Sequence, residues 1–118
     1  MDSGRFDFGV VKRQIHSQYR YAEIYWSEEE VVEVFRCFYE CYRMAFHEDH
    51  PRLSNANILK IICALPIDDE GNEFIAEEYP DLIEAYFNTE FYHCNYSMLH
   101  FMSGQIRMIR AYDLGYLP

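Results

Sequence analysis

Residues 27–47 have the sequence SEEEVVEVFRCFYECYRMAFH, and this stretch decides the fold. It opens with a capping box, in which the Ser27 hydroxyl accepts from the Glu30 amide and the Glu30 side chain reaches back. Polar residues then recur at alternating spacings of three and four along one stripe: Glu33, Arg36, Glu40, Arg43 and His47. Almost all of the remaining positions are apolar, so we expect a central helix over about 28–47 that the rest of the chain covers on two sides.

The sequence on either side of this stretch also predicts helices. Apolar residues recur at helical spacing from Phe8 to Ala22. Ser54 or Asn55 can cap a shorter helix, and Pro80 suits the first turn of another. The expected helices cover about 9–25, 28–47, 55–65, 80–87 and a long C-terminal stretch of about 95–112. The acidic residues 68–72 predict a turn between them.

Length and composition limit the class of protein. The chain has 118 residues, of which 50% are hydrophobic and 18% aromatic, so one domain with a core of its own can form. We therefore expect a compact, single-domain, all-α bundle of four to five helices over residues 1–118. No run approaches the ~20 apolar residues of a membrane span, and the first residues lack the pattern of a signal peptide. We interpret the four cysteines as reduced thiols that mostly fill the core, and expect a cytoplasmic protein with no membrane association.

Recognised catalytic and cofactor motifs do not occur in the sequence. There is no glycine-rich phosphate loop, no hydrolase nucleophile motif and no metalloprotease motif. Residues 66–77 fail as a calcium loop, because Pro66 stands where the first carboxylate ligand would be. Cys37, Cys41, His47 and His50 do not share one side of a helix and therefore do not predict a zinc site. We expect no metal, no cofactor and no enzymatic activity.

One place in the sequence offers a candidate nucleophile. His93 and Cys94 are followed by His100 and Ser103, and a Cys–His pair can perform nucleophilic catalysis. Such a pair needs a lowered thiol pKa and a third group that orients the histidine, and no local signature indicates either. The interpretation that we favour is a buried thiol beside surface histidines.

Charge is distributed unevenly along the chain. The formal net charge is −10, whereas residues 28–90 alone hold four basic and sixteen acidic side chains, a net charge of −12. The first predicted helix carries a basic face made of Lys12, Arg13, His16 and Arg20. This face is the best candidate for phosphate contacts with a nucleic acid, although the negative charge of the whole chain opposes direct binding.

These observations favour a small acidic helical protein that binds another protein, as an adaptor, regulator or inhibitor. Eleven tyrosines and one tryptophan exceed what a small core needs, which favours a partner-facing surface and self-association as a homodimer through the first or last helix. Two alternatives remain: a nucleic-acid-binding regulator that uses the basic face, and an acidic decoy that inhibits a nucleic-acid-handling protein. The acidic partner-binding surface is predicted to comprise Glu28, Glu29, Asp68, Asp69, Glu70, Glu73, Glu77, Glu78, Asp81 and Glu84.

Overall fold

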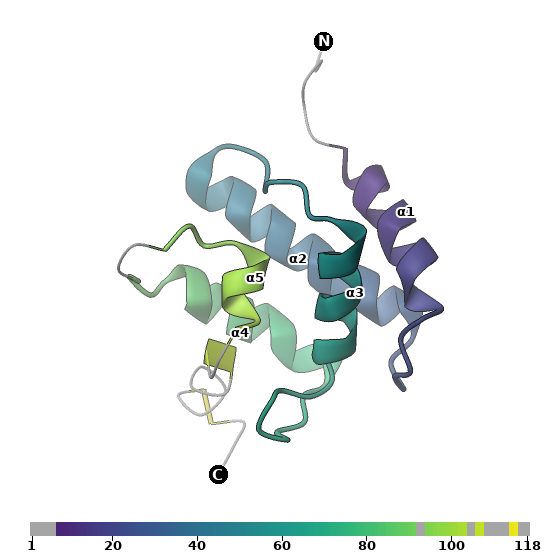
Figure 1. Cartoon of the computed structure of the whole chain (residues 1–118). Helices are drawn as coiled ribbons and strands as arrows, with labels where there is room; N and C mark the ends of the chain where they lie inside the picture. Colours follow the sequence, from purple (N-terminus) through teal and green to yellow (C-terminus); the bar gives the residue numbers. More distant parts are fainter. Residues whose placement is uncertain (1–6, 92–93, 104–105, 108–113, 116–118) are drawn as a thin grey trace.

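Helices form nearly all of the regular structure in the computed structural model, which describes residues 7–91, 94–103, 106–107 and 114–115 (Figure 1). The elements are α1 (Phe8–Tyr19), α2 (Glu28–Phe46), α3 (Asn55–Ala64), the 3-10 helix η1 (Ala76–Glu78), α4 (Tyr79–Phe87) and α5 (Met98–Phe101). Within these residues the only β-type pairing is one isolated antiparallel bridge between Ile67 and Glu73. The all-α class predicted from the sequence is confirmed.

Local sequence signals set the ends of α2. The Glu30 amide donates to the Ser27 hydroxyl at 3.1 Å, and the Ser27 amide donates to the Glu30 carboxylate at 2.8 Å, so the predicted capping box forms. At the other end His47 adopts a left-handed conformation with φ 57°, and its amide donates to the Arg43 carbonyl at 2.8 Å. Pro51 follows shortly afterwards and prevents the helix from resuming.

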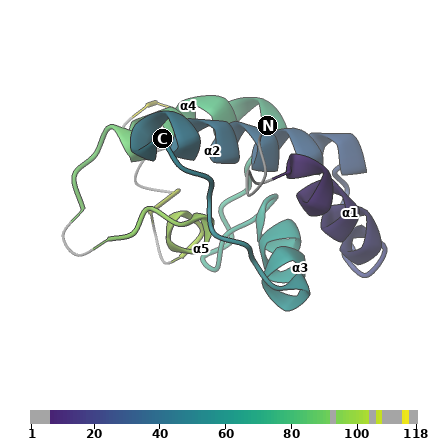
Figure 2. The same cartoon turned by 90° about the horizontal axis from the view of Figure 1, so that it is seen from above.

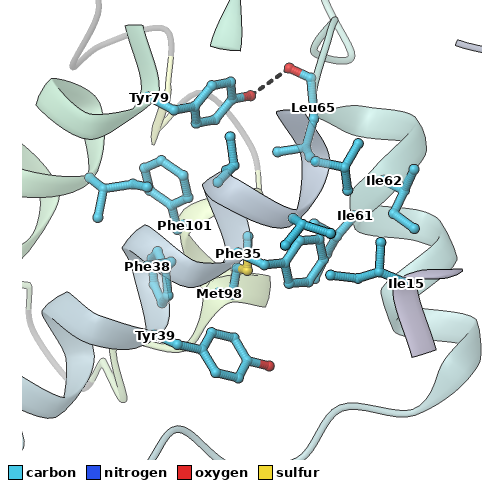
Figure 3. Close-up of a cluster of buried hydrophobic side chains, with 14 of the residues drawn as sticks. Ile15, Phe35, Phe38, Tyr39, Ile61, Ile62, Leu65, Tyr79, Met98 and Phe101 are labelled. Carbon is cyan, nitrogen blue, oxygen red and sulfur yellow. Dashed lines mark hydrogen bonds between the residues drawn. The ribbon is translucent and has the colours of Figure 1, made fainter. Parts of the chain in front are cut away.

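The helices pack in two groups around one aromatic core. α2 and α4 lie side by side, and α3 and α5 lie beneath them, with α1 packed against α2 and α3 (Figure 2). Phe35 and Phe38 of α2 point into the core, where they meet side chains from α3 and α5 such as Ile61 and Phe101 (Figure 3). The radius of gyration is 14.0 Å, as expected for a folded chain of this length.

α1 ends at Tyr19, whereas the sequence predicted helix to about residue 25. The chain turns at Arg20 and Tyr21 and returns, so that the Tyr19 hydroxyl donates to the Trp26 carbonyl. Trp26 is buried, and its ring lies edge-on to that of Tyr79 at 5.6 Å. Burial of this indole requires the chain to leave the helix early, and helical periodicity alone could not reveal that requirement.

The predicted long C-terminal helix is not confirmed. α5 begins at Met98 because the Ser97 hydroxyl caps it, and Tyr96 has a left-handed φ of 53° that no helix continues through. Residues 104–105 and 108–112 of the predicted helix lie outside the described residues. Arg107, which falls within the predicted helix of about 95–112, is buried and donates to the Ala64 carbonyl and the Tyr79 hydroxyl.

Candidate functional site

A groove lies between the first half of α2 and the segment formed by η1 and the start of α4. Its volume is about 420 Å³. The lining residues are Ser27, Glu29, Glu30, Glu33, Val34, Cys37, Ala76, Glu77 and Pro80. Four of these nine carry carboxylates, and the aliphatic groups of Val34, Ala76 and Pro80 supply most of the remaining surface. We call this feature the acidic groove.

One wall of the acidic groove follows one face of α2. Glu29, Glu33 and Cys37 are four residues apart and therefore lie one above the other on that face. Eight residues of helix span about 12 Å, which sets the length of this wall. α4 runs in the same general direction as α2, since the start of α4 borders Glu30 and its end, Phe87, packs against Tyr42 with ring centroids 6.4 Å apart.

Further carboxylates lie beyond the acidic groove, toward the end of α2, and their charges affect the pKa values of Cys37 and Cys41. The pKa of Cys37 is raised by its hydrogen bond with Cys41, by burial, and by the nearby charges of Glu40 and Glu33. The pKa of Cys41 is lowered to about 7 by the same hydrogen bond, while burial and the charges of Glu84 and Glu40 oppose this shift. Carboxylates from α2 and from α4 thus act on the same pair of side chains.

The structure disperses the ten residues of the predicted acidic surface. Glu29 and Glu77 line the acidic groove, and the exposed Glu84 lies further along α4. Glu28 faces α1 instead, where its carboxylate lies 3.1 Å from Nδ1 of His16. Glu78 is half-buried, and its pKa is raised chiefly by that burial. Asp81 is exposed on α4, and the four remaining acids, Asp68, Asp69, Glu70 and Glu73, lie in the loop after α3.

Asp68 has a structural role within that loop. Its Oδ1 accepts from the amides of Glu70 and Asn72 at 3.0 and 2.9 Å, and its Oδ2 accepts from the Asn72 side chain at 3.0 Å. Burial raises the pKa of Asp68, but these hydrogen bonds and the charge of Arg107 outweigh burial and lower it. The turn predicted over residues 68–72 therefore forms around this side chain, which binds its own loop.

Glu30 and Glu33 were missed as groove residues by sequence reasoning. The sequence assigned Glu30 to the capping box and Glu33 to a solvent stripe, and both also line the acidic groove. Glu33 accepts from Arg36 at 3.0 Å in an exposed ion pair. The spacing of Glu29, Glu33 and Cys37 was the available signal, but the opposite wall comes from residues at least 39 positions further along the chain.

The four residues of the basic face are all exposed: Lys12, Arg13 and His16 lie on α1, and Arg20 lies in the turn that directly follows it. The Arg20 guanidinium lies 5.0 Å above the Tyr21 ring, and His16 is paired with Glu28. The hydroxyl of Tyr19, at the end of the same helix, donates to the Trp26 carbonyl within the chain. Nucleic-acid binding through this face stays a prediction.

Cys94 and His100 are in contact, as the alternative interpretation of the sequence required. The Cys94 Sγ lies 3.2 Å from the His100 Nδ1, and the Tyr96 amide donates to the same sulfur at 3.1 Å. The Tyr86 hydroxyl lies 2.7 Å from the same His100 nitrogen. Sequence reasoning did not include Tyr86, because its spacing on α4 indicates only a core position. His93 lies outside the described residues.

The cysteines fill the core less than expected. Cys63 is exposed, and the other three are only partly buried. The apolar faces proposed for dimerisation are used inside the monomer, since Val11 and Ile15 of α1 and Met98 and Phe101 of α5 are buried. The large apolar side chains that remain exposed among the described residues are Tyr21, Tyr25, Met44, Phe46, Ile67, Ile75 and Leu114. Homodimerisation through the first or last helix stays a prediction.

Comparison with known proteins finds no family model that matches the chain, and no curated protein or solved structure that is similar to it. None of the described helices combines the length and apolar character needed to cross a bilayer. Across the described ranges, no three His, Cys, Asp or Glu side chains are grouped so that they could hold a metal ion.

Proposed function

We propose that this protein is a non-catalytic regulator that binds a basic protein partner through the acidic groove. One observation carries the proposal: four carboxylates and several apolar groups line the same cavity of about 420 Å³. Apolar contact supplies affinity, whereas charges of one sign select the partner and accelerate encounter. The net charge of −10 acts in the same direction, because it repels acidic partners and attracts basic ones.

Affinity capture from the native host with the full chain as bait tests this proposal. We expect a basic protein to bind at ~50 mM salt and to be released by ~300 mM salt, because salt screens the attraction between exposed charges. The double substitution Glu29→Lys with Glu77→Lys should abolish capture. A matched control, Glu48→Lys with Glu90→Lys, changes the net charge equally at exposed positions outside the acidic groove.

Capture that persists with the groove variant, or that is lost equally with the control, contradicts the proposal. The finer form of the proposal is that the partner handles nucleic acid and that the carboxylates take the place of phosphates. Identification of a partner without a basic nucleic-acid-binding surface would contradict this finer form alone. The thermal melt of each variant, followed by circular dichroism, separates loss of binding from loss of folding.

A second candidate function, thiol chemistry at Cys94, is favoured by its distance of 3.2 Å from His100. This candidate predicts that iodoacetamide labels Cys94 before the more exposed Cys63 near neutral pH, because the thiolate is the reacting form. His100→Gln should slow the labelling of Cys94 about tenfold if the imidazole withdraws the thiol proton. Mass spectrometry of the labelled peptides identifies which cysteine reacts first. If Cys63 reacts first, this candidate function is contradicted, and the contacts among Cys94, His100 and Tyr86 have a structural role only.

A further inference from the structure

We infer that the segment received by the acidic groove is a short amphipathic helix of the partner, with an apolar stripe between two basic flanks. This inference rests on the proposed function and specifies the structure of the partner segment. It draws on three features of the described residues. These are the two walls of the groove, the carboxylates on both walls, and the burial of the apolar stripe of the chain's own basic helix, α1.

The shape of the acidic groove matches a helix. One wall consists of side chains four residues apart on α2, and the other consists of Ala76, Glu77 and Pro80 at the junction of η1 and α4. A groove between two helical segments accepts the side-chain ridge of a third helix, because ridges of one helix pack into grooves on another. Helical segments are recognised in this manner through apolar residues at spacings of three and four.

Both walls of the acidic groove carry carboxylates as well as apolar groups. The α2 wall contributes Glu29, Glu33 and Val34, and the opposite wall contributes Glu77, Ala76 and Pro80. A ligand with Lys or Arg on both flanks of an apolar stripe can pair with the carboxylates of both walls and cover the apolar groups. A uniformly basic chain would pair with the carboxylates but would leave the apolar surface exposed to water.

The basic helix of a second copy is a poor occupant. α1 carries the basic face, but its apolar stripe is already covered, because Val11 and Ile15 are buried against the rest of the chain. Two copies also carry a net charge of −10 each and repel one another at low salt. The acidic groove therefore fits a helix from a different protein better than it fits α1.

Two synthetic peptides test the inference with the full chain. The first has about 14 residues, roughly four helical turns, with Leu at helical spacing and Lys and Arg on both flanks. The second has the same composition in an order that alternates apolar and basic residues and so lacks a helical stripe. Fluorescence anisotropy of the labelled peptides measures their affinities for the wild type, for Glu29→Lys with Glu77→Lys, and for the control Glu48→Lys with Glu90→Lys.

We expect the amphipathic peptide to bind the wild type about tenfold more tightly than the alternating peptide, and to lose about tenfold in affinity with the groove variant alone. Equal binding of both peptides that weakens with salt would overturn the helix inference and leave the proposed function standing. Absence of binding by either peptide would overturn the inference, while the capture experiment judges the proposed function separately. Light scattering measures the oligomeric state of the wild type and of the groove variant. A wild-type dimer that is lost in the groove variant would identify a second copy as the occupant and would also overturn the inference.

Discussion

Phe38→Ala is expected to lower the free energy of unfolding by about 3–5 kcal/mol, the cost of removing a fully buried aromatic ring and leaving a cavity. The Phe38 side chain has 0% exposure and points into the core (Figure 3). Its ring centroid lies 4.9 Å from that of Phe87 and 5.4 Å from that of Phe101, so one side chain joins α2 to both α4 and α5.

Urea unfolding followed by circular dichroism measures this loss. Met44→Ala provides the matched control on the same helix, because the Met44 side chain is 77% exposed. We expect that control to change the free energy of unfolding by no more than about 0.5 kcal/mol. A loss below about 1.5 kcal/mol for Phe38→Ala would contradict the packing described here.

Acidification below pH 6.5 is expected to destabilise the protein through His50. This imidazole is buried, its Nδ1 lies 2.7 Å from the Pro51 carbonyl, and its Nε2 accepts from the Met98 amide at 2.9 Å. The neutral ring satisfies both contacts when Nδ1 carries the proton. If Nε2 were also protonated, its N–H would face the N–H of the Met98 amide, and neither of these two donors would have an acceptor. Burial lowers the pKa of His50, and the contact with the Pro51 carbonyl opposes this only in part.

The direction of the pH effect follows from that lowered pKa. The unfolded chain binds its proton near pH 6.5, before the folded chain does, so stability is fully present above this pH. Stability then falls as the pH decreases toward the folded pKa, by about 1.4 kcal/mol for each unit between the two values. The charged groups that line the cavity beside the ring are Arg36, Glu40, Arg43 and Asp49, of which Arg43 and Asp49 form an ion pair at 2.7 Å.

Urea unfolding at pH 7.5 and at pH 5.5 measures this dependence. His50→Gln should reduce the difference between the two pH values, because its amide oxygen can accept from Met98 but does not titrate. His47→Gln, at an exposed position just after α2, should leave the difference unchanged. An identical pH dependence in the wild type and in His50→Gln would assign the effect to other groups.

Short-range signals in the sequence predicted much of the fold. The capping box at Ser27, the cap at Ser54 and the position of Pro80 all act within one or two helical turns, and each marks the start of a helix in the structure. The predictions failed where distant contacts decide. α1 ends early to bury Trp26, and Arg107 is buried because its guanidinium reaches a carbonyl 43 residues earlier in the chain.

The candidate site was predictable only in part for the same reason. Composition revealed an excess of carboxylates after residue 28, but only packing shows that Glu77 lies opposite Glu29 while Asp68 turns into its own loop. A pairing of Cys94 with His100 could be considered from the sequence because the two residues are only six positions apart. Tyr86 comes from α4, where a core tyrosine and a hydrogen-bonding tyrosine have the same spacing.

The similar direction of α2 and α4 has a consequence for the electrostatics of the folded state. The acidic groove lies where both helices begin, and each helix N-terminus carries about half a unit of positive charge from its aligned peptide dipoles. Glu28, Glu29 and Glu30 in the first turn of α2, and Asp81 in that of α4, compensate this charge. Each such carboxylate stabilises its helix by about 0.3–1 kcal/mol. Folding alone therefore favours acidic residues at this end of the molecule.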